Sequence, residues 1–166
     1  MSESRQTKKE RTYPLIKNIS QNPADYKFKE TMQVRFNETD AQGIVNNAVY
    51  FTYFEVARVE YLRRVFSKDF FDKRGFSATL GEAGCRFLSP LRFGQVIDVY
   101  VRVPEIYRVS YVYEYVIHIP ELNIPAAVGH TTIVALSNEA FRPIDLPETF
   151  VNRIMEYEGE NTRLVG

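Results

Sequence analysis

Hydrophobic and polar residues alternate with a period of two along much of this chain, which is typical of β-strands with one buried face. Segments with this pattern are predicted to be strands at about 30–36, 77–88, 96–103, 110–119 and 126–136. The segment 110–119 is the clearest, because it places Tyr111, Tyr113 and Tyr115 on one face. Prolines at positions 90, 104 and 120 are expected to end three of these strands.

The segment from about Ala48 to Phe66 contains neither glycine nor proline and carries apolar side chains around nearly its whole circumference. It predicts a helix roughly 30 Å long, at ~1.5 Å per residue, and a helix of this kind must be buried. A short helix or loop is expected at 69–75, and a final helix from Pro147. One early strand, a buried helix and four further strands predict an α+β fold whose antiparallel sheet curls around the helix.

The composition of the chain mainly narrows the number of domains, the classes of partner and the compartment that we expect. The chain has 166 residues, enough for one domain with a substantial core, and the polar segment 1–28 is assigned to an N-terminal extension of a domain at 29–166. Its 21 basic and 21 acidic side chains cancel, which gives no reason to expect nucleic acid or a membrane surface as a partner. With a single cysteine, Cys85, and no apolar signal-like or membrane-spanning run, the protein is expected to be cytoplasmic.

The junction between the first strand and the long helix holds the candidate chemistry. Asp40 and Gly43 lie there, followed by polar residues at the start of the helix. The first backbone N–H groups of a helix have no partner within it, so they could stabilise the oxygen of an acyl carbonyl as it gains negative charge. Asp40 could attack that carbonyl or activate a water, which makes acyl transfer to water the first hypothesis. Asp40 could equally serve as a helix cap or form a turn.

The same junction carries a family resemblance. Segment 36–47 (FNETDAQGIVNN), followed by Tyr50 and segment 53–58 (YFEVAR), resembles the 4-hydroxybenzoyl-CoA thioesterase-like acyl-CoA thioesterases of the hot-dog fold. The similarity runs from about Lys29 to Met155 and includes segments 88–94 (LSPLRFG) and 142–147 (RPIDLP). One departure is Gln95, where family members often carry an acidic residue, and this position is expected to shape a turn.

The resemblance implies a hydrolase of lipid metabolism that converts an acyl-CoA thioester to a free acid and CoA without a cofactor. It implies that one sheet wraps one long helix, and that two chains pair into a continuous sheet with active sites between them. Such dimers often pair again, so a homotetramer is expected. Acyl-CoA is the implied partner, although an acyl carrier protein remains an alternative thiol carrier.

The resemblance also assigns residues. Asp40 matches the catalytic aspartate of the family, as nucleophile or general base, and the backbone N–H of Asn47 matches the oxyanion donor. Substrate-binding positions are expected at Gly43, Val45, Asn46, Tyr50, Phe54 and Phe87. The arginines at 86, 92, 108 and 142 are candidate partners for the phosphates of CoA.

Glu55 and Arg58 place two charges among apolar residues of the long helix. Charges in such surroundings need partners, either each other at i, i+3 or groups on a facing subunit. Some hot-dog enzymes carry a catalytic carboxylate on the central helix, so Glu55 is a second catalytic candidate.

The remaining reactive side chains are interpreted as structural. His118 and His130 are isolated strand residues, and together with one cysteine they make no metal-ligand pattern. Cys85 is interpreted as a small apolar filler.

Two alternative functions remain to be compared with hydrolysis. Hot-dog hydratases pair an aspartate with a histidine five residues later, and here that position is Val45, which argues against dehydration. A protein that binds acyl-CoA or another acyl ligand without hydrolysing it stays open.

Overall fold

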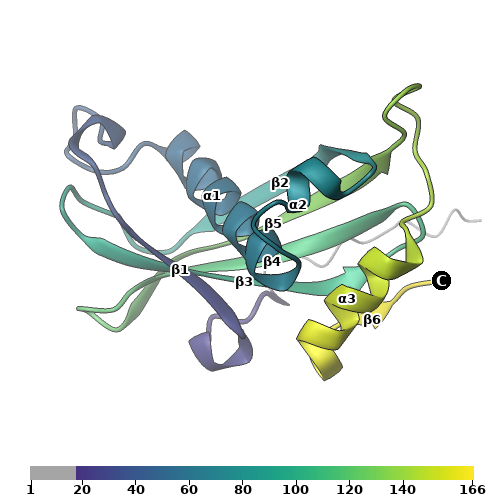
Figure 1. Cartoon of the computed structure of the whole chain (residues 1–166). Coiled ribbons are helices and arrows are strands. Elements are labelled where there is room, and N and C mark those ends of the chain that lie inside the picture. Colours follow the sequence, from purple (N-terminus) through teal and green to yellow (C-terminus); the bar gives the residue numbers. More distant parts are fainter. Residues whose placement is uncertain (1–17) are drawn as a thin grey trace, which may run out of the picture.

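A computed structural model describes residues 18–166, in which an antiparallel sheet curls around one long helix (Figure 1). The strands are β1 (Phe28–Gln33), β2 (Ser77–Phe87), β3 (Val96–Ile106), β4 (Ser110–Ile119) and β5 (Ile124–Leu136), in the spatial order β1-β3-β4-β5-β2. A short β6 (Arg163–Leu164) pairs in parallel with β3. The helices are α1 (Asn47–Val65), α2 (Phe70–Lys73) and α3 (Glu148–Glu158). The α+β class predicted from the pattern is confirmed.

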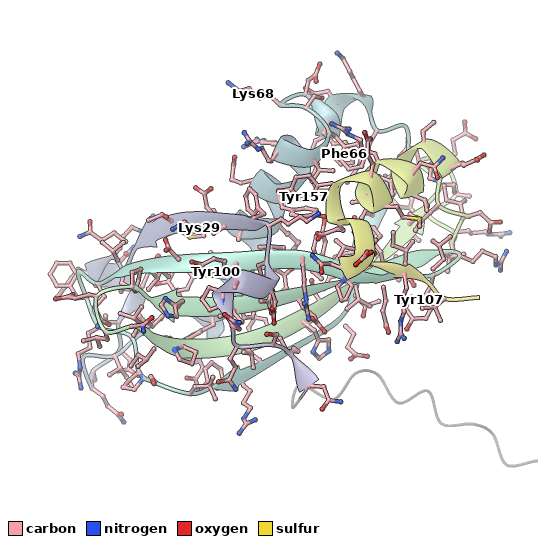
Figure 2. The ribbon with its side chains drawn as sticks, turned by 90° about the horizontal axis from the view of Figure 1, so that it is seen from below. Lys29, Phe66, Lys68, Tyr100, Tyr107 and Tyr157 are labelled. Carbon is pink, nitrogen blue, oxygen red and sulfur yellow. The ribbon has the colours of Figure 1, made fainter. Side chains whose placement is uncertain are left out.

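The helices lie on one side of the sheet, and the chain before β1 crosses to the other side (Figure 2). There Ile19 and Tyr26 pack against Val116 and Val128 of the sheet. Residues 1–17, most of the predicted extension, lie outside the described residues. One end of the predicted extension therefore covers part of the outer sheet face.

Two predicted strand boundaries were wrong. The first strand ends at Gln33 and not at Phe36, because the chain turns into a 3₁₀ helix at Phe36–Glu38. Pro104 does not end β3, which continues to Ile106. The proline is tolerated because the register between β3 and β4 shifts between Arg102 and Glu105, where no ladder bond from a proline nitrogen is required.

An irregularity in β2 decides which of its side chains face the helix. The register between β2 and β5 shifts between Leu80 and Glu82, so Gly81 is a bulge residue. Side chains face alternate sides of a strand, and one extra residue reverses that alternation. Because of the bulge, Leu80 on one side of it and Phe87 on the other both face α1.

Aromatic side chains fill the space between α1 and the sheet. The ring of Phe54 stacks on that of Tyr115 in β4, with centroids 4.4 Å apart. This close approach requires Gly129 in β5, because a Cβ atom there would lie 2.4 Å from the Phe54 ring. The predicted inward face of β4 is confirmed, since Tyr113 also contacts Tyr61 of the helix.

The prediction that α1 is buried on almost every side was wrong for a single chain. Phe51 and Val56, which lie on different sides of the helix, keep 37% and 41% of their surface exposed. Leu80 and Phe87 of β2 are similarly exposed, at 50% and 44%. The helix and the neighbouring sheet edge therefore present apolar surface to the outside.

Glu158 connects α3 to the core and makes stability depend on pH. Only 1% of it is exposed, and one carboxylate oxygen accepts hydrogen bonds from the Tyr61 hydroxyl (2.6 Å) and the Val103 N–H (3.1 Å). Its other oxygen has no partner within residues 18–166. Burial raises the pKa of Glu158 above its ordinary value of 4.5, although the two hydrogen bonds oppose this. The folded state therefore binds this proton more tightly, and the associated stability is lost as the pH rises above about 4.5.

Replacing Glu158 with glutamine is expected to raise the free energy of unfolding at pH 7 by on the order of 1 kcal/mol. An amide oxygen can accept both hydrogen bonds without placing a charge in the core. The gain should shrink toward pH 4, where the native carboxyl is protonated, and thermal melts at both pH values measure it. Glu160→Gln, at an exposed carboxylate, is the control. Equal destabilisation of Glu158→Gln at both pH values would contradict the prediction.

Candidate functional site

The Asp40 loop is a tight turn between the 3₁₀ helix and α1. The Asp40 N–H donates to the Ile44 carbonyl at 2.8 Å, and the Gly43 N–H donates to the Asp40 carbonyl at 3.0 Å. Gly43 has a φ of +74°, a conformation that glycine adopts without strain. The requirement at position 43 is therefore one of backbone geometry.

Two backbone hydrogen bonds anchor the end of this loop. The Val45 N–H donates to the Leu91 carbonyl at 2.9 Å, and the Asn46 N–H donates to the Glu38 carbonyl at 3.0 Å. The first bond ties the loop to the segment before β3, and the second ties it to the 3₁₀ helix. In that same segment Gln95 accepts a hydrogen bond from the Arg92 N–H at 2.7 Å, which confirms its predicted role in shaping a turn.

The start of α1 leaves one backbone donor open. Asn46 is the N-cap, and its side-chain oxygen accepts from the Ala48 N–H at 2.9 Å. The Asn47 N–H donates to no group within residues 18–166, and Asn47 is exposed. This amide also lies at the positive end of the helix dipole. It is thus available to a carbonyl or carboxylate oxygen of a ligand.

Asp40 is exposed in the single chain, and one of its carboxylate oxygens accepts from the Gln42 N–H at 2.8 Å. This is the turn-forming bond considered as the alternative to catalysis. The other oxygen accepts no hydrogen bond from residues 18–166 and remains free to act on a ligand.

Glu38 supports the loop from below and was not singled out from the sequence. Only 7% of it is exposed, and its carboxylate accepts from the Arg35 N–H (2.8 Å), Arg35 Nε (2.9 Å) and the Tyr53 hydroxyl (2.7 Å). Burial alone would raise the pKa of Glu38, but these hydrogen bonds and the Arg35 charge lower it overall. In the sequence, this role was indicated only by an acidic residue three positions after an arginine. The third partner, Tyr53, lies on α1, so the sequence pattern around Glu38 does not include it.

Most of the predicted substrate-binding residues surround this helix start. Gly43 and Asn46 are exposed in the loop, whereas Val45 and Tyr50 are buried beneath it. Tyr50 meets the exposed ring of Phe87 edge-to-face, with centroids 4.9 Å apart. Phe54 is fully buried in the core of this chain, one turn further along α1.

Comparison with known proteins identifies the family. Residues 34–154 match the thioesterase-like superfamily, which is most of the chain. The chain belongs to this superfamily. A protein of Aquifex aeolicus (strain VF5), named provisionally as an esterase, is 34% identical over 96 residues, which are 57% of this chain and 75% of that protein. YneP of Bacillus subtilis (strain 168), named provisionally as an acyl-CoA thioesterase, is 29% identical over 78% of this chain and 94% of its own length.

A solved structure agrees with the fold. A thioesterase from Thermus thermophilus, crystallised with coenzyme A and Zn, is 31% identical and has a TM-score of 0.70. The match covers 81% of this chain and 96% of that one. The hot-dog fold implied by the resemblance is confirmed for this thioesterase-like protein.

Glu55 and Arg58 do not pair with each other in this thioesterase-like chain. Within residues 18–166 no ion pair joins them, so the i, i+3 pairing is not formed and a facing subunit is the remaining predicted partner. Glu55 is exposed on α1, well away in sequence from the Asp40 loop. The structure leaves its predicted catalytic role as a hypothesis.

The other candidate side chains of this superfamily member lie in ordinary environments. His130 bonds to Glu82 at 2.9 Å, and burial raises the pKa of Cys85 to about 12, which suits an unreactive filler. Arg108 pairs with Asp145 at 2.8 Å, while the arginines at 86, 92 and 142 are exposed.

Among residues 18–166, no three His, Cys, Asp or Glu side chains are placed to hold a metal ion. Nor does any described helix have the length and apolarity to cross a bilayer.

Proposed function

We propose that this protein hydrolyses acyl-CoA thioesters to a free acid and CoA. The observation that carries the proposal is the open Asn47 N–H at the start of a 19-residue helix, beside a loop that presents the Asp40 carboxylate. The superfamily match supports it, as do the coenzyme A bound by the Thermus thioesterase and the provisional name of YneP.

The proposed chemistry uses this chain's own groups. The thioester carbonyl oxygen accepts a hydrogen bond from the Asn47 N–H, which stabilises the negative charge that develops there. Asp40 either attacks the carbonyl carbon or takes a proton from a water that attacks it. A carbon–oxygen bond forms, the carbon–sulfur bond breaks, and the departing thiolate takes up a proton. When Asp40 is the nucleophile, water then hydrolyses the acyl–Asp40 anhydride, which releases the free acid and restores the carboxylate.

A second copy of the chain is expected to close the site. Within the described chain β2 pairs with β5 alone, so its outer edge leaves backbone N–H and C=O groups available for another strand. The exposed side chains of Leu80 and Phe87 lie on this strand. Pairing of two β2 edges into a continuous sheet would bury them and enclose Asp40, and two such homodimers would form the expected homotetramer.

A second candidate function is binding without hydrolysis. The hydrogen bond from the Gln42 N–H to Asp40 is one that a purely structural aspartate would also accept. Under this alternative the helix start would hold an acyl ligand, and the carboxylate would only stabilise the turn.

Thiol release from short, medium, long and aromatic acyl-CoA thioesters tests the proposal directly. We expect hydrolysis of at least one class, and the same assay with acyl carrier protein thioesters identifies the thiol carrier. Tight binding of acyl-CoA by calorimetry with no thiol release from any substrate would favour the binding function instead.

A further inference from the structure

A cavity of about 170 Å³ lies on the flank of α1, between this helix, α2 and strands β2 and β4. It is lined in part by Arg58, Leu62, Phe71, Arg74, Leu80 and Tyr113. A protein cavity of about 150 Å³ is large enough to bind benzene, so this space can hold the end of a small organic group.

Two arginines in this cavity have no carboxylate partner. Arg58 and Arg74 are both partly buried, and no Asp or Glu within residues 18–166 forms an ion pair with either. The Arg74 guanidinium lies over the rings of Phe71 and Phe76, 5.5 and 5.7 Å from their centroids. Partly buried charges are costly unless paired, so this arrangement favours an anion from outside the described chain.

The Arg58 charge acts on the tyrosines behind the cavity. Burial raises the pKa of Tyr111 to about 12, and the charges of Arg74 and Arg58 oppose that rise. The Arg58 charge also opposes the effect of burial on the pKa of Tyr115, whose hydroxyl bonds to Thr131. Among the described residues, Glu55 is the one carboxylate that lines the cavity, and it is exposed. The inner wall is therefore electropositive.

Tyr113 places an unused hydrogen-bonding group behind the same wall. Its side chain is fully buried, and its hydroxyl has no partner of good geometry within residues 18–166, although the Tyr111 hydroxyl is a close neighbour. Buried hydroxyls are normally hydrogen-bonded. Because this oxygen is itself buried, it lies behind the cavity wall, and Arg58 and Arg74 are the charged groups offered to a ligand in the cavity.

The cavity and the start of α1 both adjoin strand β2. Helix α1 and strand β2 run side by side in opposite directions, because Tyr50 meets Phe87 at one end and Arg58 lines the cavity with Leu80 at the other. The exposed ring of Phe51 lies between these ends on α1. From Asn47 to Arg58 the helix rises by roughly 16 Å, at ~1.5 Å per residue. An acyl chain that starts at this chain's own helix start must therefore be long to reach the cavity.

We propose that this cavity selects acyl groups that end in a carboxylate, which Arg58 and Arg74 bind by charge. The guanidinium fork matches a carboxylate in shape as well as charge. This proposal rests on the proposed thioesterase function, because it names the class of acyl group that the same enzyme hydrolyses.

The test compares matched thioesters that differ only at the far end of the acyl chain: adipoyl-CoA with hexanoyl-CoA, and dodecanedioyl-CoA with lauroyl-CoA. In at least one pair, wild-type kcat/KM should be about tenfold or more higher for the carboxylated substrate, because charge-assisted hydrogen bonds form with it alone. Arg58→Gln and Arg74→Gln should each reduce this ratio, mainly through KM. Arg63→Gln is the matched control, since Arg63 lies on the same helix, pairs with Glu60 and is outside the cavity.

Binding of non-hydrolysable thioether analogues of the same pairs, measured by calorimetry, separates this proposal from the proposed function. Tighter binding of the carboxylated analogue that Arg58→Gln abolishes would support the cavity's role even if no thiol were ever released. Hydrolysis with equal kcat/KM for both members of each pair, unchanged by Arg58→Gln, would overturn the cavity's role and leave the thioesterase function standing. An altered oligomeric state of Arg58→Gln with an unchanged ratio would also overturn it, because the anion would then be a carboxylate of a second copy.

Discussion

Asp40→Asn is expected to lower kcat for acyl-CoA hydrolysis by about 10²- to 10⁴-fold while the protein stays folded. An amide can neither attack the thioester carbonyl nor take a proton from water. Its oxygen can, however, still accept the hydrogen bond from the Gln42 N–H that shapes the turn. The substitution therefore removes the proposed chemistry and retains the local structure. Thiol release at saturating acyl-CoA and thermal melting measure the two properties.

Asp72→Asn provides the matched control for this prediction. Asp72 is also an exposed aspartate, in α2, and it lies outside the Asp40 loop. Its substitution should leave kcat at the wild-type value. If Asp40→Asn kept more than half of the wild-type kcat with an unchanged melting temperature, the carboxylate would be a turn-forming group only, and the assignment of its catalytic role would be wrong.

Glu38→Ala is expected to reduce both stability and activity, because the residue positions the Asp40 loop from within the protein. Its removal leaves the Tyr53 hydroxyl and two donors of Arg35 without their acceptor. Because the Arg35 side chain is mostly exposed, the main loss is the hydrogen bond that Tyr53 donates to a charged acceptor. That loss costs about 2 kcal/mol, which corresponds to a decrease of roughly 6 °C in Tm for a chain of this size. A decrease in kcat should accompany it, because the Glu38 carbonyl also holds the Asn46 N–H at the start of the helix.

The pH dependence distinguishes this role from simple packing. Because the pKa of Glu38 is lowered in the folded protein, its contribution to stability is present above its ordinary value of 4.5 and is lost as the pH falls through the folded pKa. Glu38→Gln should restore part of the stability at pH 7 and remove this acid-dependent component. Glu121→Ala, at an exposed carboxylate in the β4–β5 turn, should change neither property. A wild-type Tm and kcat in Glu38→Ala would contradict the positioning role.

Patterns local in sequence predicted most of the fold. The strands and the long helix followed from hydrophobic periodicity, because the face a residue presents depends on its position within its own element. The start of the helix beside Asp40 was predictable for the same reason, since loop and helix are contiguous. Local rules failed where the partner element decided the outcome. Pro104 lies within β3 because the pairing with β4 shifts there, and Gly81 forms a bulge that reverses the alternation of β2.

The sequence by itself determined the α+β class, the antiparallel strands around one helix and the aspartate loop at the helix start. Only the tertiary structure decided that Glu38 bonds to Tyr53, and that Arg58, Arg74 and Tyr113 line one cavity in which no carboxylate of residues 18–166 pairs with the arginines. Periodicity reports the side to which a residue points, whereas the meeting of side chains from separate elements depends on strand register, bulges and helix packing. Those are properties of the whole folded chain, and no single segment contains them.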